Sequence, residues 1–351
     1  MKQPIICITG GHLTPALAVI DEIKRQKLLW KLVFIGRSHA FEGGGSPAHE
    51  ERLISAFGIP FHALFTGRQG PSMWKFPIGF FQSFFLLASY RPKAVLSFGG
   101  YIALPVAIAA WILRIPIITH EQTEDLGLAN AIIARLARRV LLAREIGIPM
   151  RNALFHPPGQ PLSFPIDSKL PLIYITGGST GAQSLNAFVY PNVGELIGHN
   201  AVIHQVGTPG LGEALRVKEA LTKTMRSRYI VVSYLDIGDL SWVYHNAVLL
   251  IGRAGANTVA EVSALGLPAL FIPLPWAAGN EQSHNAARLE KSGTAVVVNQ
   301  HALTPASFLT HVFELMQHLD THRYAAKRVA LAYPRSAASK IVDEVARCIH
   351  P

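Results

Sequence analysis

The sequence predicts an α/β protein built from two doubly wound parallel sheets. Short apolar segments alternate with helical patterns along the whole chain, as in consecutive βαβ units. Residues 4–11 and 171–178 also resemble each other, because each reads as a buried strand that ends in Thr-Gly-Gly and opens a helix. The chain has 351 residues, whereas single cores stop growing at roughly 250–300 residues. We therefore expect two domains.

The strands and the domain boundaries follow from the same pattern. Besides the two repeated segments, the expected strands are residues 32–35, 94–98, 115–119, 201–205, 229–233, 247–251, 269–272 and 295–298. A Pro/Gly-rich stretch at residues 156–161 is the expected hinge. The predicted organisation is therefore a domain 1–156, a domain 157–335 and an amphipathic helix within 336–351. Because ligands of such sheets bind beyond the carboxyl ends of the strands, the site is expected in the cleft between the domains.

The charge and cysteine content narrow the class of protein. With 32 Lys and Arg against 22 Asp and Glu, the net charge of +10 indicates an anionic partner. No zinc-finger spacing, RNP motif or dense basic run accompanies this charge, so nucleic acid is the minority interpretation. Two cysteines cannot form a disulfide framework, which favours a reducing compartment. The uncharged run 94–113 is long enough to span a bilayer, but its glycines and Pro105 favour a strand, a turn and a buried helix.

The first glycine turn carries a candidate catalytic base. Gly10 and Gly11 allow close approach of a ligand, and Pro15 suits the first turn of a helix whose free N–H groups attract anions. His12 lies at the strand tip, where a neutral imidazole is able to accept a proton near pH 7. The alternative is a hydrogen-bonded turn histidine, which position alone favours.

Two segments of the second half indicate a nucleotide site. The turn at residues 177–182 repeats the glycine design with hydroxyls, and Ser179 with backbone N–H groups suits a phosphate. Residues 252–261 follow a predicted strand and open a helix. Glu261 lies among apolar residues there, so a carboxylate that accepts two ribose hydroxyls is favoured over a solvated one.

Further polar clusters follow other predicted strands. Asn280, Gln282 and Asn285 begin a helix, where amides either read sugar hydroxyls or form caps. The segment 119–130 either holds an acceptor or forms a structural network. No Asp-X-Asp metal pair, Ser-His-Asp signature or nucleophilic cysteine accompanies these clusters. We therefore expect helix dipoles and backbone donors, rather than a metal, to stabilise a leaving group.

Aromatic residues crowd residues 73–87. A buried helix explains Phe84, Phe85, Leu86 and Leu87. The preceding segment, from Trp74 to Phe81, is flanked by basic residues and is interpreted either as core or as a basic-rimmed apolar patch that docks on anionic lipid. The flanking basic residues are Arg68, Lys75, Arg91 and Lys93.

Taken together, these motifs resemble the MurG family, the peptidoglycan N-acetylglucosaminyltransferases of the GT-B fold, over almost the entire chain. One such motif is weak, whereas six in the same order are specific. The segments that carry the resemblance are residues 9–12 with 15–19, 99–101, 120–122 with Asn130, 177–182, 253–261, and 266–270 with Gln282 and Asn285.

The resemblance implies two Rossmann-like domains, the first binding acceptor and membrane and the second binding UDP-GlcNAc. The implied reaction is inverting, metal-independent transfer of GlcNAc to the 4-hydroxyl of MurNAc in undecaprenyl-pyrophosphoryl-MurNAc-pentapeptide (lipid I). The product is lipid II for peptidoglycan, and no cofactor is implied. The implied location is the cytoplasmic face of the cell membrane, as a peripheral protein. Anionic inner-leaflet lipids would bind at the patch near Trp74–Phe81, and other cell-wall synthesis proteins are implied partners.

The resemblance also assigns roles to individual residues. His12 would be the catalytic base, Glu261 would bind the ribose, and Gln282 would contact the GlcNAc hydroxyls. The full implied donor set is Thr9, Gly10, Gly11, Thr14, Ser179, Leu235, Arg253, Gly255, Glu261, Gln282 and Asn285. Tyr101, Glu121 and Asn130 would line the acceptor side.

Three alternatives remain open at this point. The first keeps the fold and the UDP-sugar donor but changes the acceptor to another lipid-linked sugar. The second is a catalytically silent cell-wall scaffold, against which the presence of both His12 and Glu261 argues. The third is a basic nucleic-acid binder, whose binding would depend steeply on salt without competition by UDP.

Overall fold

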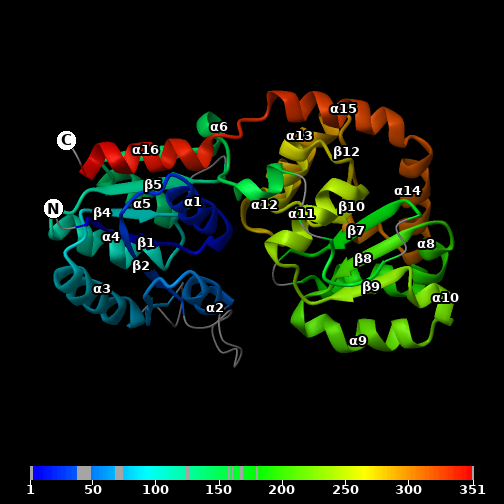
Figure 1. Ribbon diagram of the computed structural model, residues 1–351, viewed down its shortest axis with the longest axis horizontal. Coiled ribbons are helices and arrows are strands. Elements are labelled where there is room, and N and C mark those ends of the chain that lie inside the picture. Colours follow the sequence, from blue (N-terminus) through cyan, green and yellow to red (C-terminus); the bar gives the residue numbers. More distant parts are fainter. Residues whose placement is uncertain are drawn as a thin grey trace. The chain divides into compact units, whose positions relative to one another are not determined.

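The computed structural model describes residues 3–37, 49–67, 74–123, 127–156, 159, 161–166, 169–178 and 181–349. Its internal contacts divide the chain into two units, 1–152 with 334–351 and 153–333. Each unit contains one six-stranded sheet among the described residues, and every pair of neighbouring strands is parallel (Figure 1). The predicted α/β class with two doubly wound sheets is confirmed.

The first unit has the strand order β3-β2-β1-β4-β5-β6. Its strands are β1 (Ile5–Thr9), β2 (Lys31–Gly36), β3 (Phe61–Ala63), β4 (Ala94–Ser97), β5 (Ile117–Glu121) and β6 (Arg139–Leu142). Its helices are α1 (Leu13–Arg25), α2 (His49–Ala56), α3 (Phe76–Tyr90), α4 (Ala103–Ile112), α5 (Leu128–Leu136), α6 (Ala143–Ile146) and α16 (Ala337–Ile349). The order reverses between β1 and β4, and such a switch point is where doubly wound sheets bind ligands.

The second unit repeats this order as β12-β11-β10-β7-β8-β9. Its strands are β7 (Leu172–Thr176), β8 (Ala201–Gln205), β9 (Tyr229–Val232), β10 (Ala247–Gly252), β11 (Ala269–Phe271) and β12 (Ala295–Val297). Its α-helices are α7 (Gln183–Val189), α8 (Val193–His199), α9 (Gly207–Glu219), α10 (Lys223–Arg226), α11 (Ile237–Asn246), α12 (Ala256–Leu265), α13 (Glu281–Lys291), α14 (Pro305–Gln317) and α15 (Leu319–Ala332). Short 3-10 turns are η2 (Asn152–Phe155), η3 (Tyr190–Asn192), η4 (Ala278–Asn280) and η5 (Gln300–Ala302).

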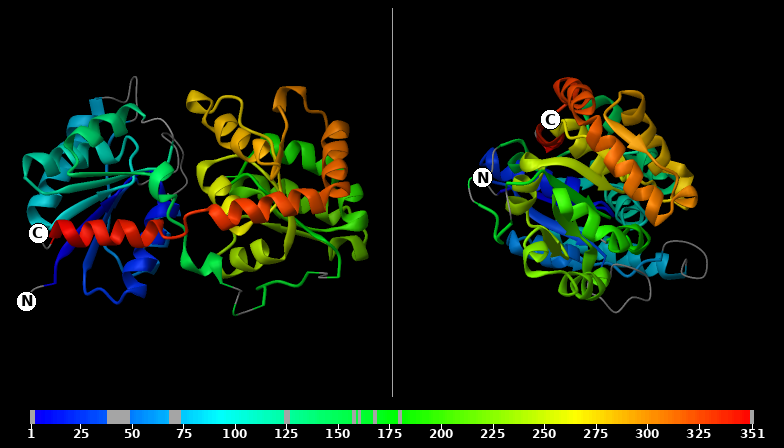
Figure 2. Two further views of the ribbon diagram at one scale, coloured as in Figure 1. Left: turned by 90° about the horizontal axis from the view of Figure 1, so that it is seen from above. Right: turned by 90° about the vertical axis from the view of Figure 1, so that its right-hand side faces the viewer.

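The C-terminal helix α16 packs in the first unit although the chain reaches it from the second. Ile341, Val342 and Val345 are at most 1% exposed and join the core formed with α1 and β4. Figures 1 and 2 show this helix, drawn in red, lying along the strands of the first sheet. The apolar face that the spacing predicts is therefore buried against the N-terminal half of the chain.

The uncharged run 94–113 forms strand β4, a glycine turn and helix α4. None of the described helices is both long enough and apolar enough to cross a bilayer.

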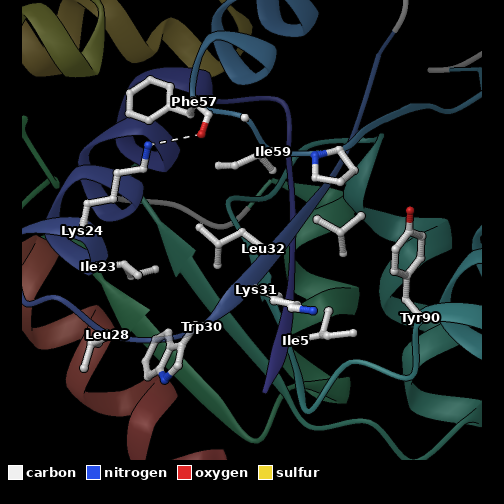
Figure 3. Close-up of a pocket in the computed structure, with 13 residues that line it drawn as sticks. Ile5, Ile23, Lys24, Leu28, Trp30, Lys31, Leu32, Phe57, Ile59 and Tyr90 are labelled. Atoms are coloured by element: carbon white, nitrogen blue, oxygen red, sulfur yellow. Dashed lines mark hydrogen bonds between the residues drawn. The ribbon is translucent and has the colours of Figure 1, made fainter. Parts of the chain in front are cut away.

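A pocket of about 410 Å³ lies at the amino ends of β1 and β2 (Figure 3). Ile5 and Lys31, the first residues of these strands, line it with Trp30, and Lys24 Nζ donates to the carbonyl of Phe57 at its wall. None of the predicted site residues lines this pocket. The pocket lies at the edge of the sheet opposite to the one where doubly wound folds bind ligands.

Candidate active site

The predicted base lies at the carboxyl edge of the first sheet, between β1 and α1. Gly10 has φ +149°, and a Cβ there would lie 2.8 Å from Cβ of Phe98, so only glycine fits the turn. The Gly11 N–H donates to the carbonyl of Gly99 over 2.9 Å. His12 then adopts an extended conformation as the N-cap of α1, without using its side chain as a cap. The turn therefore leaves the imidazole available for other contacts.

The His12 ring meets the polar segment after β5. Gln122 Nε2 lies 2.8 Å from His12 Nδ1. Burial lowers the pKa of His12 below its ordinary value, the charge of Glu121 opposes this effect, and Arg37 adds to it. The imidazole is therefore neutral at pH 7, as a proton acceptor must be.

Two of the predicted acceptor-side residues, Glu121 and Asn130, form hydrogen bonds within the protein. Asn130 Nδ2 donates to a Glu121 carboxylate oxygen, and Asn130 Oδ1 accepts from the Gly100 N–H over 2.9 Å. The other Glu121 oxygen accepts from the N–H and hydroxyl of Thr123. The segment is thus a hydrogen-bond network that ties the Gly99–Gly100 turn to α5 and to the end of β5. Tyr101 is half-buried directly after that turn.

Both threonines of the first turn are placed near His12. Thr9 ends β1 with no exposed surface, and no described residue bonds its buried Oγ1. Thr14 is half-buried in the first turn of α1. Their contact with a donor stays a prediction.

The second glycine turn occupies the matching position after β7. Gly181 has φ +76°, and a Cβ there would lie 2.4 Å from the carbonyl oxygen of Val206. The Gly178 N–H donates to Thr176 Oγ1, and Gln205 Nε2 donates to the carbonyl of Gly178 over 3.1 Å. These bonds fix the turn that precedes α7. Ser179, the predicted phosphate contact, lies outside the described residues.

Arg253 follows β10 and is 5% exposed. Its Nη1 donates to the carbonyl of Ile272, and its Nη2 donates to Ser184 Oγ and to Gln300 Oε1. No described carboxylate pairs with this guanidinium, its buried Nε is without a partner among those residues, and burial lowers its pKa to about 10. Arg253 therefore joins three segments around the second sheet edge and carries an uncompensated positive charge there.

Glu261 lies one and a half turns into α12, behind the cap residue Gly255. The carboxylate is 8% exposed, and burial raises its pKa to about 7. Tyr244 on α11 donates from its hydroxyl to Glu261 Oε2 over 2.5 Å. The expected apolar surroundings are present, because Ala260 and Val262 are also buried.

The predicted amide residues reach back from α13 to neighbouring loops. Gln282 Oε1 accepts from the Leu274 N–H over 2.9 Å, and Asn285 Nδ2 donates to the carbonyl of Ala254 over 3.2 Å. Each side-chain amide thus uses one of its polar atoms in a hydrogen bond to the backbone. Leu235 is buried after β9, directly before Asp236, which caps α11 through the Asp239 N–H. Within the described part of the chain, no group of three His, Cys, Asp or Glu is arranged to hold a metal ion.

Sequence reasoning missed three residues that hold the predicted ones. Gln122 belongs to the motif at residues 120–122, which by itself predicts no role for this side chain, and Gln205 ends a predicted strand. Tyr244 gave no signal at all, because a tyrosine on an amphipathic helix is ordinarily core. Only the fold places it beside Glu261.

Two doubly wound parallel sheets, each with a glycine turn at its carboxyl edge, are the architecture of the GT-B fold that many glycosyltransferases have. The model of the glycosyltransferase family 28 N-terminal domain matches residues 6–142, and that of its C-terminal domain matches residues 172–344. The chain belongs to glycosyltransferase family 28.

Individual relatives agree with this assignment. The chain is 31% identical to a UDP-N-acetylglucosamine–N-acetylmuramyl-(pentapeptide) pyrophosphoryl-undecaprenol N-acetylglucosamine transferase of Actinobacillus pleuropneumoniae, covering 97% of this chain and 95% of the relative. It is 33% identical to the same-named enzyme of Ralstonia nicotianae, with coverage of 95% and 93%. The crystal structure of Acinetobacter baumannii MurG superposes with a TM-score of 0.71 at 25% identity over 99% of this chain and all of that one.

Proposed function

We propose that the protein transfers GlcNAc from UDP-GlcNAc to the 4-hydroxyl of MurNAc in lipid I, with inversion at C1, to form lipid II for peptidoglycan. The observation that carries this proposal is the near-full-length similarity to transferases whose names state this donor and acceptor. Because the similarity spans both units, it includes the half that would bind the acceptor and the half that would bind the donor.

The residues of the first unit would act on the acceptor, and those of the second unit would bind the donor. His12, neutral at pH 7, accepts the proton of the acceptor hydroxyl as that oxygen bonds to C1 of GlcNAc. The bond from C1 to the UDP oxygen breaks in the same displacement, and the electron pair leaves with UDP. Backbone N–H groups at the starts of α7 and α12, with the uncompensated charge of Arg253, stabilise the diphosphate. Glu261 accepts the ribose hydroxyls.

Membrane docking belongs to the same proposal, because the lipid-linked acceptor remains in the bilayer. Four apolar side chains in α3 or just before it are 40–67% exposed: Trp74, Ile78, Phe81 and Phe85. Lys75 Nζ lies 5.1 Å from the centroid of the Phe65 ring. Phe85 is 67% exposed, so the expectation that a buried helix explains it was wrong: Gly79, Ser83 and Leu87 form the buried stripe of α3. These residues (Trp74, Ile78, Phe81 and Phe85) form what we call the α3 patch. Its lipid-binding role at the cytoplasmic face is supported by its apolar surface and basic neighbour.

Transfer of radiolabelled GlcNAc to a short-chain lipid I analogue tests the proposal. We expect label in the lipid product from UDP-GlcNAc, and none when the acceptor is a polyprenyl pyrophosphate that carries a sugar other than MurNAc. His311→Ala, which removes a half-buried histidine of α14, is the matched control for histidine loss and should leave transfer unchanged. Label in the other lipid-linked sugar would show that lipid I is not the specific acceptor. UDP-GlcNAc binding without any transfer would favour the scaffold interpretation.

A further inference from the structure

The hydroxyl of Tyr244 is the one described donor to the carboxylate of Glu261. The bond joins two helices, since Tyr244 lies on α11 and Glu261 on α12, and its length of 2.5 Å is typical of a hydroxyl that donates to an ionised oxygen. Tyr244 is 5% exposed and Glu261 is 8% exposed. Removing this donor would therefore leave a buried carboxylate without a partner among the described side chains.

A chain of contacts connects this pair to the second glycine turn. The ring of Tyr244 meets that of Tyr174 edge-on, with 5.8 Å between the centroids. Tyr174 Oη donates to Gln205 Oε1 over 2.9 Å, and Gln205 Nε2 donates to the carbonyl of Gly178. The Tyr244 ring is thus packed on Tyr174, which hydrogen-bonds to the Gln205 side chain that supports the glycine turn. This packing restricts the positions available to the Tyr244 hydroxyl.

We propose that Tyr244 is a positioning residue for the nucleotide ribose, which it serves by holding Oε2 of Glu261 so that Oε1 accepts the ribose hydroxyls. This inference rests on the proposed function, because it presupposes a uridine nucleotide at Glu261. No described residue donates to Oε1 of Glu261. A vicinal diol supplies hydroxyl donors for that oxygen, whereas a carboxylate free to rotate would lose rotamer freedom on binding.

The same hydroxyl favours the ionised form of the carboxylate. Burial raises the pKa of Glu261, and the hydrogen bond from Tyr244 lowers it. The titratable groups that face the carboxylate are Tyr244 from α11 and Tyr174 from β7, and Tyr234 faces Tyr174 in turn. Burial raises the pKa of both Tyr244 and Tyr174, so these two hydroxyls are neutral near pH 7. Loss of the hydroxyl would raise the pKa of Glu261 further and neutralise the acceptor.

Tyr244→Phe separates this role from simple packing, because it removes one oxygen and retains the ring that packs on Tyr174. Tyr229→Phe is the matched control. Its hydroxyl is also buried and hydrogen-bonded, to His204 Nδ1 over 2.9 Å, but it has no contact with Glu261. The probes are UDP and 2′,3′-dideoxy-UDP, with binding measured by calorimetry on the full chain.

The proposal predicts that Tyr244→Phe binds UDP about tenfold more weakly than the wild type, as for loss of a hydrogen bond to a charged group. Binding of dideoxy-UDP should change by less than about twofold, because the ribose hydroxyls are the groups whose partner is lost. In turnover, KM for UDP-GlcNAc should rise while kcat stays near the wild-type value. The difference from wild type should shrink at about pH 8, where more of Glu261 is ionised.

Equal loss for UDP and dideoxy-UDP would overturn the proposal, because the hydroxyl would then serve only the fold. Unchanged UDP binding would overturn it as well. If Tyr244→Phe folds poorly, the Glu261→Gln variant is compared with the double variant Glu261→Gln and Tyr244→Phe. The double variant should bind UDP no more weakly than Glu261→Gln alone, and an additive loss of affinity contradicts the proposal. A wild-type chain that fails to bind UDP overturns the proposed function itself, whereas wild-type binding with an unaffected variant overturns only the role of Tyr244.

Discussion

The Gln122 side chain meets the His12 ring across 110 residues of sequence, with Nε2 of the amide 2.8 Å from Nδ1 of the imidazole. The amide oxygen, Oε1, is buried without a partner among the described residues. With the amide N–H donating to Nδ1, the proton of neutral His12 sits on Nε2. With the amide turned by half a rotation, Oε1 accepts from Nδ1–H and leaves Nε2 as the base. Base action through Nε2 therefore requires the second amide orientation, in which Gln122 selects the tautomer that carries its proton on Nδ1.

Gln122→Ala should lower kcat by about tenfold, because the imidazole loses the contact that orients it and selects its tautomer. UDP-GlcNAc binding should stay unchanged. Steady-state kinetics with calorimetry measure both, and Gln26→Ala, which removes an amide at the end of α1, is the control. A rise in KM for UDP-GlcNAc at constant kcat would place Gln122 in donor binding instead.

Two pH limbs should separate the roles of His12 and Glu261. Burial holds the pKa of His12 below its ordinary value near 6.5, so kcat at saturating donor should fall only below about pH 6.5. Burial raises the pKa of Glu261 to about 7, so protonation as pH falls through about 7 should weaken donor binding and lower kcat/KM for UDP-GlcNAc. Glu261→Gln should abolish the limb near 7 and retain the other. A kcat limb above pH 7 would contradict the assignment of His12.

Phe81→Ser combined with Phe85→Ser should weaken binding to phosphatidylglycerol vesicles by about tenfold, because both side chains leave the α3 patch. Co-sedimentation measures the bound fraction. Leu331→Ser removes an 89% exposed apolar side chain from α15, outside the patch, and should bind as the wild type does. Equal binding by all variants would show that the patch has another purpose.

Ile341→Ala should destabilise the first unit selectively, because this α16 side chain is fully buried against it. A loss of about 3 kcal/mol is expected for a truncated core isoleucine. Native-state hydrogen exchange should report the loss in β1 and β4 but not in β7 and β10. Uniform loss across both sheets would mean that the two units unfold together.

The sequence patterns predict the interior strands of both sheets but miss two edge strands. Apolar runs indicate strands that are buried on both faces, such as β1, β4 and β10. β3 has three residues and no fully buried one, and β6 begins at the exposed Arg139; both lie at the edges of the first sheet. Because edge strands need not be apolar, periodicity identifies some of them, such as β9 and β12 of the second sheet, and misses others.

The sequence predicts those residues of the candidate site whose positions depend on local backbone geometry. It does not predict those whose positions depend on contacts between different elements. Strand ends followed by glycine and a helix place His12 and Glu261 at sheet edges, which the sequence patterns indicate directly. The partners Gln122 and Tyr244 come from other elements, and no local pattern encodes a contact between side chains on different elements. Likewise, the exposed aromatics of α3 follow from which face meets α4, and the uniformly apolar sequence of α3 does not reveal that face.

The central claim is that His12 accepts the proton of the acceptor in GlcNAc transfer, and His12→Ala tests it most directly. Turnover with a lipid I analogue and calorimetric binding of UDP-GlcNAc are measured on the same preparation. The account predicts that turnover falls by at least about a hundredfold, as for loss of a general base, while UDP-GlcNAc affinity stays within about twofold of wild type. Loss of turnover and donor affinity in equal measure would contradict it.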